Sequence, residues 1–479
     1  MTQFIRKMVW AVCFLWSAGN GSLAAQATER PNIWFCIADD WSYPHAGVFW
    51  DKVVRTPNID RLARQGMVFT NAFCAAPSCT PSRAAILTGR YPHELEQGGN
   101  LWSFLPTKFK VVPDVLEDAG YAVGHTRKGW GPGNFRAGGR ERNPAGPNFR
   151  SFGEFLEKSG GKPIWFWFGS QDPHRPYVRG SGAKAGLEAA KVDVPKVWPD
   201  TPEIRNDILD YYFEVERFDR EIGELLADLE KAGKLKNTIV IVTADNGMPF
   251  PRAKANLYDL GARVPLVVWG PGVKRGTSDA FVNLADLGPT FLEFAGVKPV
   301  SEMSARSIAS LVRGEKQEKR EMVFLERERH ANVRKGDLSY PSRAVRTKEF
   351  LYIRNLRPER WPAGDPEMHH SVGPYGDCDN SPTKAFIVEK REAAGVENLF
   401  QLGFGKRPAE ELYDLEDDTA QMKNVATDAK YAEVKDALRR ALNEWMKRTN
   451  DPRVDEKNDA WSAYDYFGGA GPRPARVTE

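Results

Sequence analysis

The sequence contains little cysteine, little histidine and almost no excess charge. Among 479 residues there are 5 cysteines and 7 histidines, and 67 lysines and arginines nearly balance 64 aspartates and glutamates. So few cysteines exclude a disulfide framework, and a formal net charge of +3 does not indicate a general surface for nucleic acid. No apolar run reaches the roughly 20 residues that span a bilayer, which excludes a polytopic membrane protein. The 41% hydrophobic residues suffice for a large folded core.

The first 27 residues have the pattern of a cleavable export signal. Arg6 and Lys7 precede an apolar run at 8–18, and small residues follow at 22–27. We therefore expect a secreted or periplasmic protein with no membrane anchor. A retained anchor is the alternative, although the apolar run is short for one. Without these two cations the formal charge falls from +3 to +1, and four cysteines remain: Cys36, Cys74, Cys79 and Cys378.

Short apolar runs alternate with helical patterns over the first two thirds of the chain. The runs expected as strands are 32–37, 164–168, 238–243 and 265–269. A helix is expected from Thr56-Pro57 to Gly66, with the threonine hydroxyl as its cap, and a longer helix from about Ile208 to a stop at Gly233. The prolines at 195, 199 and 202 favour extended chain before it. This alternation predicts an α/β domain with a mainly parallel central sheet flanked by helices.

The character of the chain changes after about residue 305. Charged residues crowd 313–329, and short strand-like pieces such as 350–353 follow. We expect a main domain over 28–319 and a smaller C-terminal α+β domain over 320–479. That domain ends in an amphipathic helix whose apolar positions are Tyr431, Val434, Leu438, Leu442 and Trp445. The sequence does not indicate an oligomeric state.

Two polar clusters come directly after expected strands. Asp39 and Asp40 follow the first strand, and Asp245 and Asn246 follow the strand at 238–243. The carboxyl ends of strands form the ligand crevice of open α/β sheets. Three carboxylates and an amide oxygen converging there suit calcium, or less well magnesium. The alternative is that each pair only caps a following helix or turn.

The segment Cys79-Thr-Pro-Ser-Arg83 is a third candidate for chemistry. Pro81 favours the first turn of a short helix, which places residue 79 at the helix N-terminus, where backbone amides favour an anion. A thiolate nucleophile is one interpretation, and a buried inert cysteine is the other.

These motifs carry a family resemblance. Cys79-Thr-Pro-Ser-Arg83 with Leu87-Thr-Gly89 resembles the maturation signature of the type I sulfatases, in which a maturation enzyme oxidises the cysteine to formylglycine. The paired aspartates and Asp245-Asn-Gly247 match the calcium site of that family, and the resemblance runs from about residue 31 to about 448. It implies an alkaline-phosphatase-like large domain. The segments 171–176, 245–251 and 338–341 are most similar to the heparan N-sulfatase (sulfamidase) branch.

The resemblance implies a mechanism and a set of roles. One hydroxyl of hydrated formylglycine attacks sulfur, and the other later expels sulfate as the aldehyde re-forms. The substrate is expected to be a sulfated sugar, with N-sulfoglucosamine of heparan as the candidate and another O-sulfated polysaccharide or an aryl sulfate as the alternative. The implied roles are a single Ca2+ held by Asp39, Asp40, Asp245, Asn246 and Cys79, a hydroxyl steadied by Arg83, sulfate oxygens bound by Lys128 and Lys254, and a leaving group protonated by His174.

One position departs from the family pattern. The family has a lysine followed two residues later by a histidine that touches formylglycine, but this chain reads Lys128-Gly-Trp130. His125 is out of frame, so the role is not transferred to it, and we expect that another base serves.

Weaker candidates complete the sequence reading. His330 and Arg127 are candidate substrate contacts, and the basic loop to which Arg127 belongs is either a contact for an anionic sugar or a solvated surface. His45, His93 and His369-His370 either line the pocket or are ordinary surface or core histidines. Two other functions are weighed: a two-zinc phosphatase or phosphodiesterase of the related fold, which the few histidines disfavour, and a non-catalytic glycan-binding protein, motivated by Trp130.

Overall fold

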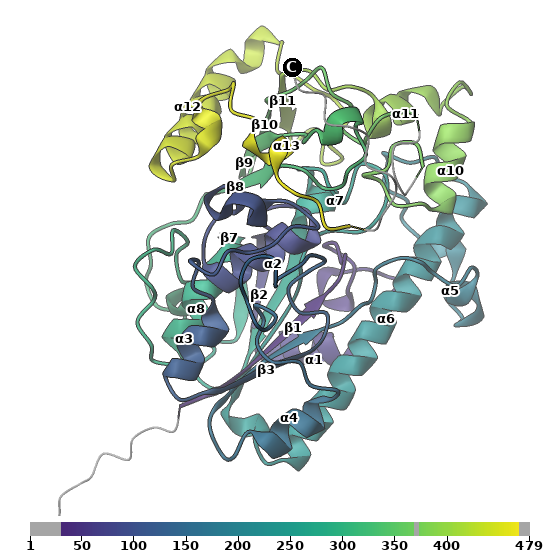
Figure 1. Cartoon of the computed structure of the whole chain (residues 1–479). Helices are drawn as coiled ribbons and strands as arrows, with labels where there is room; N and C mark the ends of the chain where they lie inside the picture. The colour runs from purple at the N-terminus through teal and green to yellow at the C-terminus, as the bar shows by residue number, and fades with distance from the viewer. Residues whose placement is uncertain (1–29, 368–372, 469–479) are drawn as a thin grey trace, which may run out of the picture.

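A large mixed sheet with helices on both faces makes up most of the molecule, and a smaller antiparallel sheet lies at one end of it (Figure 1). The computed structural model describes residues 30–367 and 373–468. The expected export signal and His369-His370 lie outside the described residues. In spatial order the large sheet consists of β3 (Ala122–Arg127), β4 (Ile164–Gly169), β1 (Asn32–Ala38), β5 (Thr238–Ala244), β6 (Arg263–Trp269), β2 (Met67–Phe73) and β7 (Gly276–Asn283).

The sheet is mainly parallel, as the alternating pattern predicts. The four expected runs are the strands β1, β4, β5 and β6, whereas β2, β3 and β7 were not expected from short apolar runs. Four of the six neighbouring pairs are parallel, and β6 is antiparallel to both β5 and β2. Every residue of β1 and β5 is buried, because these central strands are covered on both faces.

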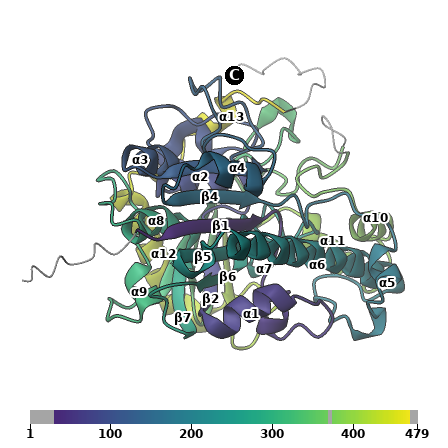
Figure 2. The same cartoon turned by 90° about the horizontal axis from the view of Figure 1, so that it is seen from below.

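Helices cover both faces of the sheet. Figure 2 shows α1 (Pro57–Gln65) and α6 (Pro202–Lys231) on one face, and α3 (Val112–Asp118) and α8 (Leu287–Phe294) on the other. Aromatic contacts connect the layers: the rings of Phe168 in β4 and Phe218 in α6 stack at 6.4 Å between centroids, and Phe35 in β1 meets Phe291 in α8 at 5.1 Å. The alternation of strand side chains thus supplies both faces with apolar contacts.

The two expected helices form, with one difference in capping. Thr201 Oγ1 accepts a hydrogen bond from the Ile204 N–H at the start of α6, and Gly233, with φ of +68°, follows its end. The helix α1 begins at Pro57 as expected, but Thr56 makes no cap hydrogen bond with its side chain. Its hydroxyl instead donates to Asp60 Oδ1 at 3.0 Å and accepts the Gly47 N–H at 2.9 Å, so it holds the preceding loop.

The smaller sheet has the order β11-β10-β9-β8 and is antiparallel. Its strands are β8 (Met322–Arg327), β9 (Ser342–Thr347), β10 (Phe350–Asn355) and β11 (Glu410–Asp414). The final helix α12 (Ala432–Arg448) buries Leu438, Leu442 and Trp445 against this sheet, which confirms the expected amphipathic helix. The domain boundary near residue 320 remains a prediction.

Shorter helices complete the described chain, and none of its helices is long and apolar enough to cross a membrane. They are α2 (Cys79–Thr88), α4 (Phe152–Lys158), α5 (Ser181–Lys184), α7 (Asp259–Ala262), α9 (Ala309–Arg313), α10 (Pro382–Glu389), α11 (Glu397–Phe404), α13 (Ala460–Ala463) and the 3-10 helices Gly47–Phe49, Pro92–Gly99, Ala189–Lys191, Leu235–Asn237, Leu284–Asp286, Lys335–Asp337, Ala429–Tyr431 and Pro452–Val454.

Candidate active site

The register of two central strands brings the two acidic clusters together. β1 and β5 are parallel neighbours in which Ala38 lies opposite Ala244. The residues that follow each strand therefore leave the sheet side by side. The Asp40 N–H donates to Asp245 Oδ1 at 3.1 Å, and Asn246 Nδ2 donates to Asp40 Oδ1 at 2.8 Å. The clusters expected from the sequence thus form one site at the carboxyl edge of the sheet.

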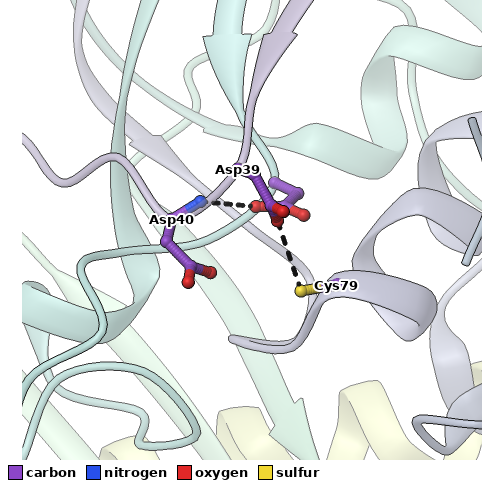
Figure 3. Close-up of side chains that lie close together, drawn as sticks. Asp39, Asp40 and Cys79 are labelled. Atoms are coloured by element: carbon purple, nitrogen blue, oxygen red, sulfur yellow. Dashed lines mark hydrogen bonds between the residues drawn. The ribbon is translucent and has the colours of Figure 1, made fainter. Parts of the chain in front are cut away.

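Cys79 reaches this site from the start of α2. The helix begins at Cys79, with Pro81 in its first turn as the sequence predicts, and all ten of its residues are buried. Cys79 Sγ lies 3.4 Å from Asp39 Oδ1, and Figure 3 shows the thiol pointing from the helix toward the end of β1. Burial raises the pKa of the thiol well above its ordinary value, and the nearby Lys128 and Lys254 only partly oppose this. Unmodified Cys79 is therefore a protonated thiol and a weak nucleophile.

The acidic groups have the composition of a cation site. One ligand atom from each of Asp39, Asp40, Cys79 and Asp245 can be chosen so that all lie within 4.8 Å of one another, and all four residues are buried. Asn246 Oδ1 is also buried and has no hydrogen-bond partner among the described residues. Three carboxylates and a free amide oxygen are the donors that a hard divalent cation such as Ca2+ prefers. The residues present therefore fit the metal that the sequence reading expects.

Three cationic side chains surround the acidic group. Lys128, which follows β3, places Nζ 2.6 Å from Asp39 Oδ2, and Lys254 Nζ lies 2.7 Å from Asp40 Oδ2. Arg83 Nε donates to Asp245 Oδ2 at 2.8 Å, and its Nη1 donates to the carbonyl oxygens of Lys128 and Gly129. Arg83 is fully buried, so it ties α2 to the ends of β3 and β5.

These charges set the protonation of two carboxylates in opposite directions. Burial by itself would raise the pKa of Asp39, but Lys128, His174 and Arg83 hold it well below its ordinary value. Burial raises the pKa of Asp40 despite the opposing charge of Lys254. The pKa values of carboxylates that share a buried site move apart in this way when no cation lies between them.

His174 reaches the same carboxylates from the loop after β4. Its Nδ1 lies 2.5 Å from the Arg175 carbonyl oxygen, which can only accept a hydrogen bond, so Nδ1 carries a proton. Its Nε2 lies 3.8 Å from Asp40 Oδ2. Arg175 holds the loop because it forms a bidentate pair with Asp207 in α6, at 2.8 and 2.9 Å. The other ring nitrogen, Nε2, therefore faces the acidic group.

A cavity of about 1130 Å3 opens over this group. It is lined by Asp39, Cys79, Lys128, His174 and Lys254, so the structure brings together the residues that the sequence singled out, with Arg83 beneath them. The two candidate substrate contacts also line it. His330 donates or accepts a hydrogen bond at Ser78 Oγ, 2.8 Å from its Nδ1, and Arg127 forms an ion pair with Glu221.

Other residues that the sequence suggested lie away from the cavity or are paired with other side chains. His45 is buried beside Asp51 and Tyr212, and His93 is buried beside Glu326. In the basic loop, Arg142 pairs with Asp114 and Glu117 on α3, although it also lines the cavity. The described histidines outside the cavity are thus structural, and much of the loop charge is neutralised locally.

At position 130, where the family has a histidine, the structure places a tryptophan that lines the cavity. Asn143 fixes Trp130 through two hydrogen bonds to its backbone, and the indole lines the cavity. His125, which is out of frame with the family histidine, also lines the cavity. Its ring packs against Gly129, because a Cβ added to that glycine would lie 2.9 Å from its Nε2. Burial lowers the pKa of His125 to about 4, so its ring is neutral. An imidazole is therefore present beneath this loop, although not at the family position.

Sequence reasoning missed the side of the cavity that comes from the C-terminal part. Asp379 and Tyr466 line it, opposite residues of the large sheet. No motif spacing marks them, because only the packing of the smaller sheet against the large one brings these segments to the cavity. The acidic run Asp377-Cys-Asp379 was the available signal, and nothing in it indicates a pocket.

The fold and the site together define an α/β protein with a cavity over a buried acidic group, cationic side chains and Cys79. The chain belongs to the sulfatase family: the model of that family matches residues 31–297, more than half of the chain. Membership makes the protein a hydrolase of sulfate esters or sulfamates. A model described as N-sulphoglucosamine sulphohydrolase, C-terminal, matches residues 252–367.

Individual relatives agree with this assignment. The chain is 28% identical to N-sulphoglucosamine sulphohydrolase of Homo sapiens, over 89% of this chain and 92% of the relative. It is 26% identical to an ulvan-active sulfatase of Formosa agariphila, over 93% of this chain and 80% of the relative. A solved structure in complex with its substrate D-glucosamine-2-N,6-O-disulfate matches with a TM-score of 0.63 at 21% identity, over 90% of this chain and 100% of the other. The last likeness confirms the alkaline-phosphatase-like fold.

Proposed function

We propose that the protein removes the sulfate group from N-sulfoglucosamine of a heparan-like chain, with Cys79 converted to formylglycine and one Ca2+ bound. The observation that carries the catalytic part is the placement of Cys79, buried at the start of α2 and 3.4 Å from Asp39, in a cavity that also holds Lys128 and Lys254. A thiol that burial keeps protonated is a weak nucleophile at this position, whereas an aldehyde hydrate supplies oxygen nucleophiles there.

One hydroxyl of hydrated formylglycine forms a bond to sulfur as the bond from sulfur to nitrogen or oxygen breaks and the leaving group takes up a proton. The C–O bond to the sulfate then breaks as the second hydroxyl loses its proton and becomes the aldehyde oxygen, and water restores the hydrate. A Ca2+ held by Asp39, Asp40, Asp245 and Asn246 would supply a Lewis acid for the sulfate group. Lys128 and Lys254 stand beside the acidic group and offer ammonium hydrogens to the remaining sulfate oxygens.

Two side chains of the site act on protons and position. His174 Nε2 is the atom that can deliver a proton to the leaving nitrogen or oxygen, because its Nδ1–H is donated to a carbonyl. Arg83 keeps Asp245 and the backbone of Lys128 in place, so the acidic group and the first lysine stay in register.

Support for an N-sulfated sugar comes from the comparisons. The C-terminal model and the human relative both carry the name N-sulphoglucosamine sulphohydrolase. The second candidate is an O-sulfated polysaccharide, which the similarity to an ulvan-active sulfatase supports. The export pattern of residues 6–27 supports a secreted or periplasmic location, and the segment Cys79-Thr-Pro-Ser-Arg83 supports maturation of Cys79 by a separate enzyme.

The test is release of inorganic sulfate by matured protein from two matched disaccharides. One ends in N-sulfoglucosamine, and the other ends in 6-O-sulfated N-acetylglucosamine. We expect release from the first. Release from the second alone would assign the O-sulfatase candidate, and release from neither, with formylglycine confirmed at position 79 by mass spectrometry, would overturn the choice of sugar.

A further inference from the structure

Asp379 is a carboxylate in the cavity wall that the proposed chemistry leaves without a role. It lies between β10 and α10, in the C-terminal part of the chain, and its side chain is 28% exposed. Its Oδ2 lies 3.5 Å from Lys254 Nζ, the same ammonium that contacts Asp40. The cavity lining thus joins a residue of the smaller-sheet region to the sulfate-binding side of the site.

The charge of Asp379 is unusual for an anion-binding cavity. Burial would raise its pKa, but the charges of Lys254, His174 and His330 lower it to about 2, so the group is ionised. A fixed negative charge near the lysines opposes the binding of a sulfate group. Such a residue favours a sulfated substrate when it gains a hydrogen-bond donor from that substrate on binding.

The side chain of Asp379 accepts no hydrogen bond from residues 30–367 or 373–468. Among these residues the buried Oδ2 has only the longer contact with Lys254. The other carboxylates that line the cavity are already partnered: Asp39 accepts hydrogen bonds from Lys128, and Asp172 pairs with Arg217 at 3.3 Å. Asp379 therefore offers acceptor sites to a ligand.

We propose that Asp379 accepts hydrogen bonds from N–H or O–H groups of the sugar ring that carries the sulfate, and so selects sulfated sugars over sulfate esters without such donors. This inference rests on the proposed function. Lys254 Nζ lies between the two carboxylates, 3.5 Å from Asp379 Oδ2 and 2.7 Å from Asp40 Oδ2. Because Asp379 is this close to the acidic group, a donor that it binds belongs to the sugar ring next to the scissile bond. Charge-assisted hydrogen bonds to a carboxylate supply the selectivity.

The test compares substrates with and without ring donors in matured Asp379→Asn protein, which keeps the size of the side chain and removes its charge. The substrates are the two disaccharides above and para-nitrophenyl sulfate, whose leaving group has neither hydroxyl nor amine. We expect kcat/KM for the sugar cleaved by wild-type protein to fall about 10- to 100-fold, mainly through KM. Hydrolysis of para-nitrophenyl sulfate should change by less than about threefold.

Each outcome decides the inference. An equal fall for the sugar and the aryl sulfate would show that Asp379 acts only by positioning Lys254, and an unchanged sugar rate would show that it does not touch the substrate. A loss confined to the N-sulfated sugar assigns the donor to the sulfamate N–H, whereas a loss shared with the O-sulfated sugar assigns it to ring hydroxyls. Asp365→Asn is the control, because Asp365 lies in the same region, bonds the Lys335 N–H and does not line the cavity.

A binding measurement separates this inference from the catalytic proposal. Cys79→Ala protein cannot turn over substrate, so calorimetry with an N-sulfoglucosamine disaccharide reports binding alone. We expect Asp379→Asn in that background to weaken binding about 10- to 100-fold. Equal affinities would overturn the role of Asp379, whereas a failure of wild-type protein to hydrolyse any sulfate would overturn only the proposed function.

Discussion

Residue 79 combines a reactive position with an unreactive group. The start of α2 and two lysines surround the thiol with positive charge, yet burial keeps its pKa above the ordinary value. The pair Arg83 and Asp245 beside it is likewise fully buried and joined at 2.8 Å. At the scale of single residues the site therefore disfavours a thiolate, which supports the proposed conversion of Cys79 to formylglycine.

Replacement of Cys79 by alanine should lower sulfate release by at least about 10^4-fold, because the variant cannot form formylglycine. The melting temperature should stay near that of wild-type protein, since the change removes one sulfur atom. Activity and thermal unfolding are measured on the same preparation, with Cys36→Ala as the control for a buried cysteine in β1. Substantial turnover by the Cys79 variant would contradict the mechanism.

Asp245→Asn should weaken cation binding, because it removes one charged donor from the acidic group and the partner of Arg83 Nε. In wild-type protein the melting temperature should rise when CaCl2 is added after chelation, as binding to the folded state requires. The rise should be lost or much smaller in the variant and preserved in Asp118→Asn, at an exposed position. A rise of wild-type size in Asp245→Asn would refute the metal assignment.

At the scale of elements, α12 shows how the C-terminal part is held. Trp445 is almost fully buried, its ring stacks on Phe324 of β8 at 5.0 Å, and it meets Tyr91 and His93 edge-on at 5.0 and 5.1 Å. One side chain thus joins the last long helix to the smaller sheet and to the segment after α2. The position of α12 depends on packing more than on helix propensity.

Trp445→Ala should lower the free energy of unfolding by about 3–5 kcal/mol, because it removes a large buried aromatic side chain. Urea unfolding measures this loss, and Lys447→Ala on the exposed face of the same helix should have little effect. A loss below about 1 kcal/mol in Trp445→Ala would mean that α12 is not held by this contact.

At the scale of the whole molecule, buried histidines connect stability to pH. The pKa of His125 falls from 6.5 to about 4, because burial disfavours the charged ring. Between these values the unfolded chain binds more protons than the folded one, so stability is full above pH 6.5 and is lost as the pH falls toward 4. His330 has a pKa lowered to about 4 for the same leading reason and acts in the same direction.

Between pH 6.5 and 4, the free energy of unfolding should fall by about 3 kcal/mol less in His125→Gln than in wild-type protein. This figure is the shift in the pKa of His125 converted to free energy. Urea unfolding of wild-type and variant protein across this range gives the two slopes. The same slope in both proteins would show that His125 is not buried as a neutral ring in solution.

The sequence by itself determined which residues are candidates for the chemistry and which elements carry those residues. The apolar runs ending at Asp39 and Asp245, the proline after Cys79 and the spacing of Trp445 each lie within one local segment, and local segments follow from periodicity and turn chemistry. The convergence of the two acidic clusters was also predicted, because the carboxyl ends of parallel strands lie at one edge of a sheet, and the pairing of β1 with β5 brings them together.

Only the tertiary structure decided the rest of the cavity. Asp379 enters it from beyond the smaller sheet, His125 lies beneath Gly129 although it is out of frame, and Thr56 holds a loop instead of capping α1. These placements depend on contacts between segments far apart in the chain. Packing and the partners available after folding set such contacts, and no local pattern encodes them.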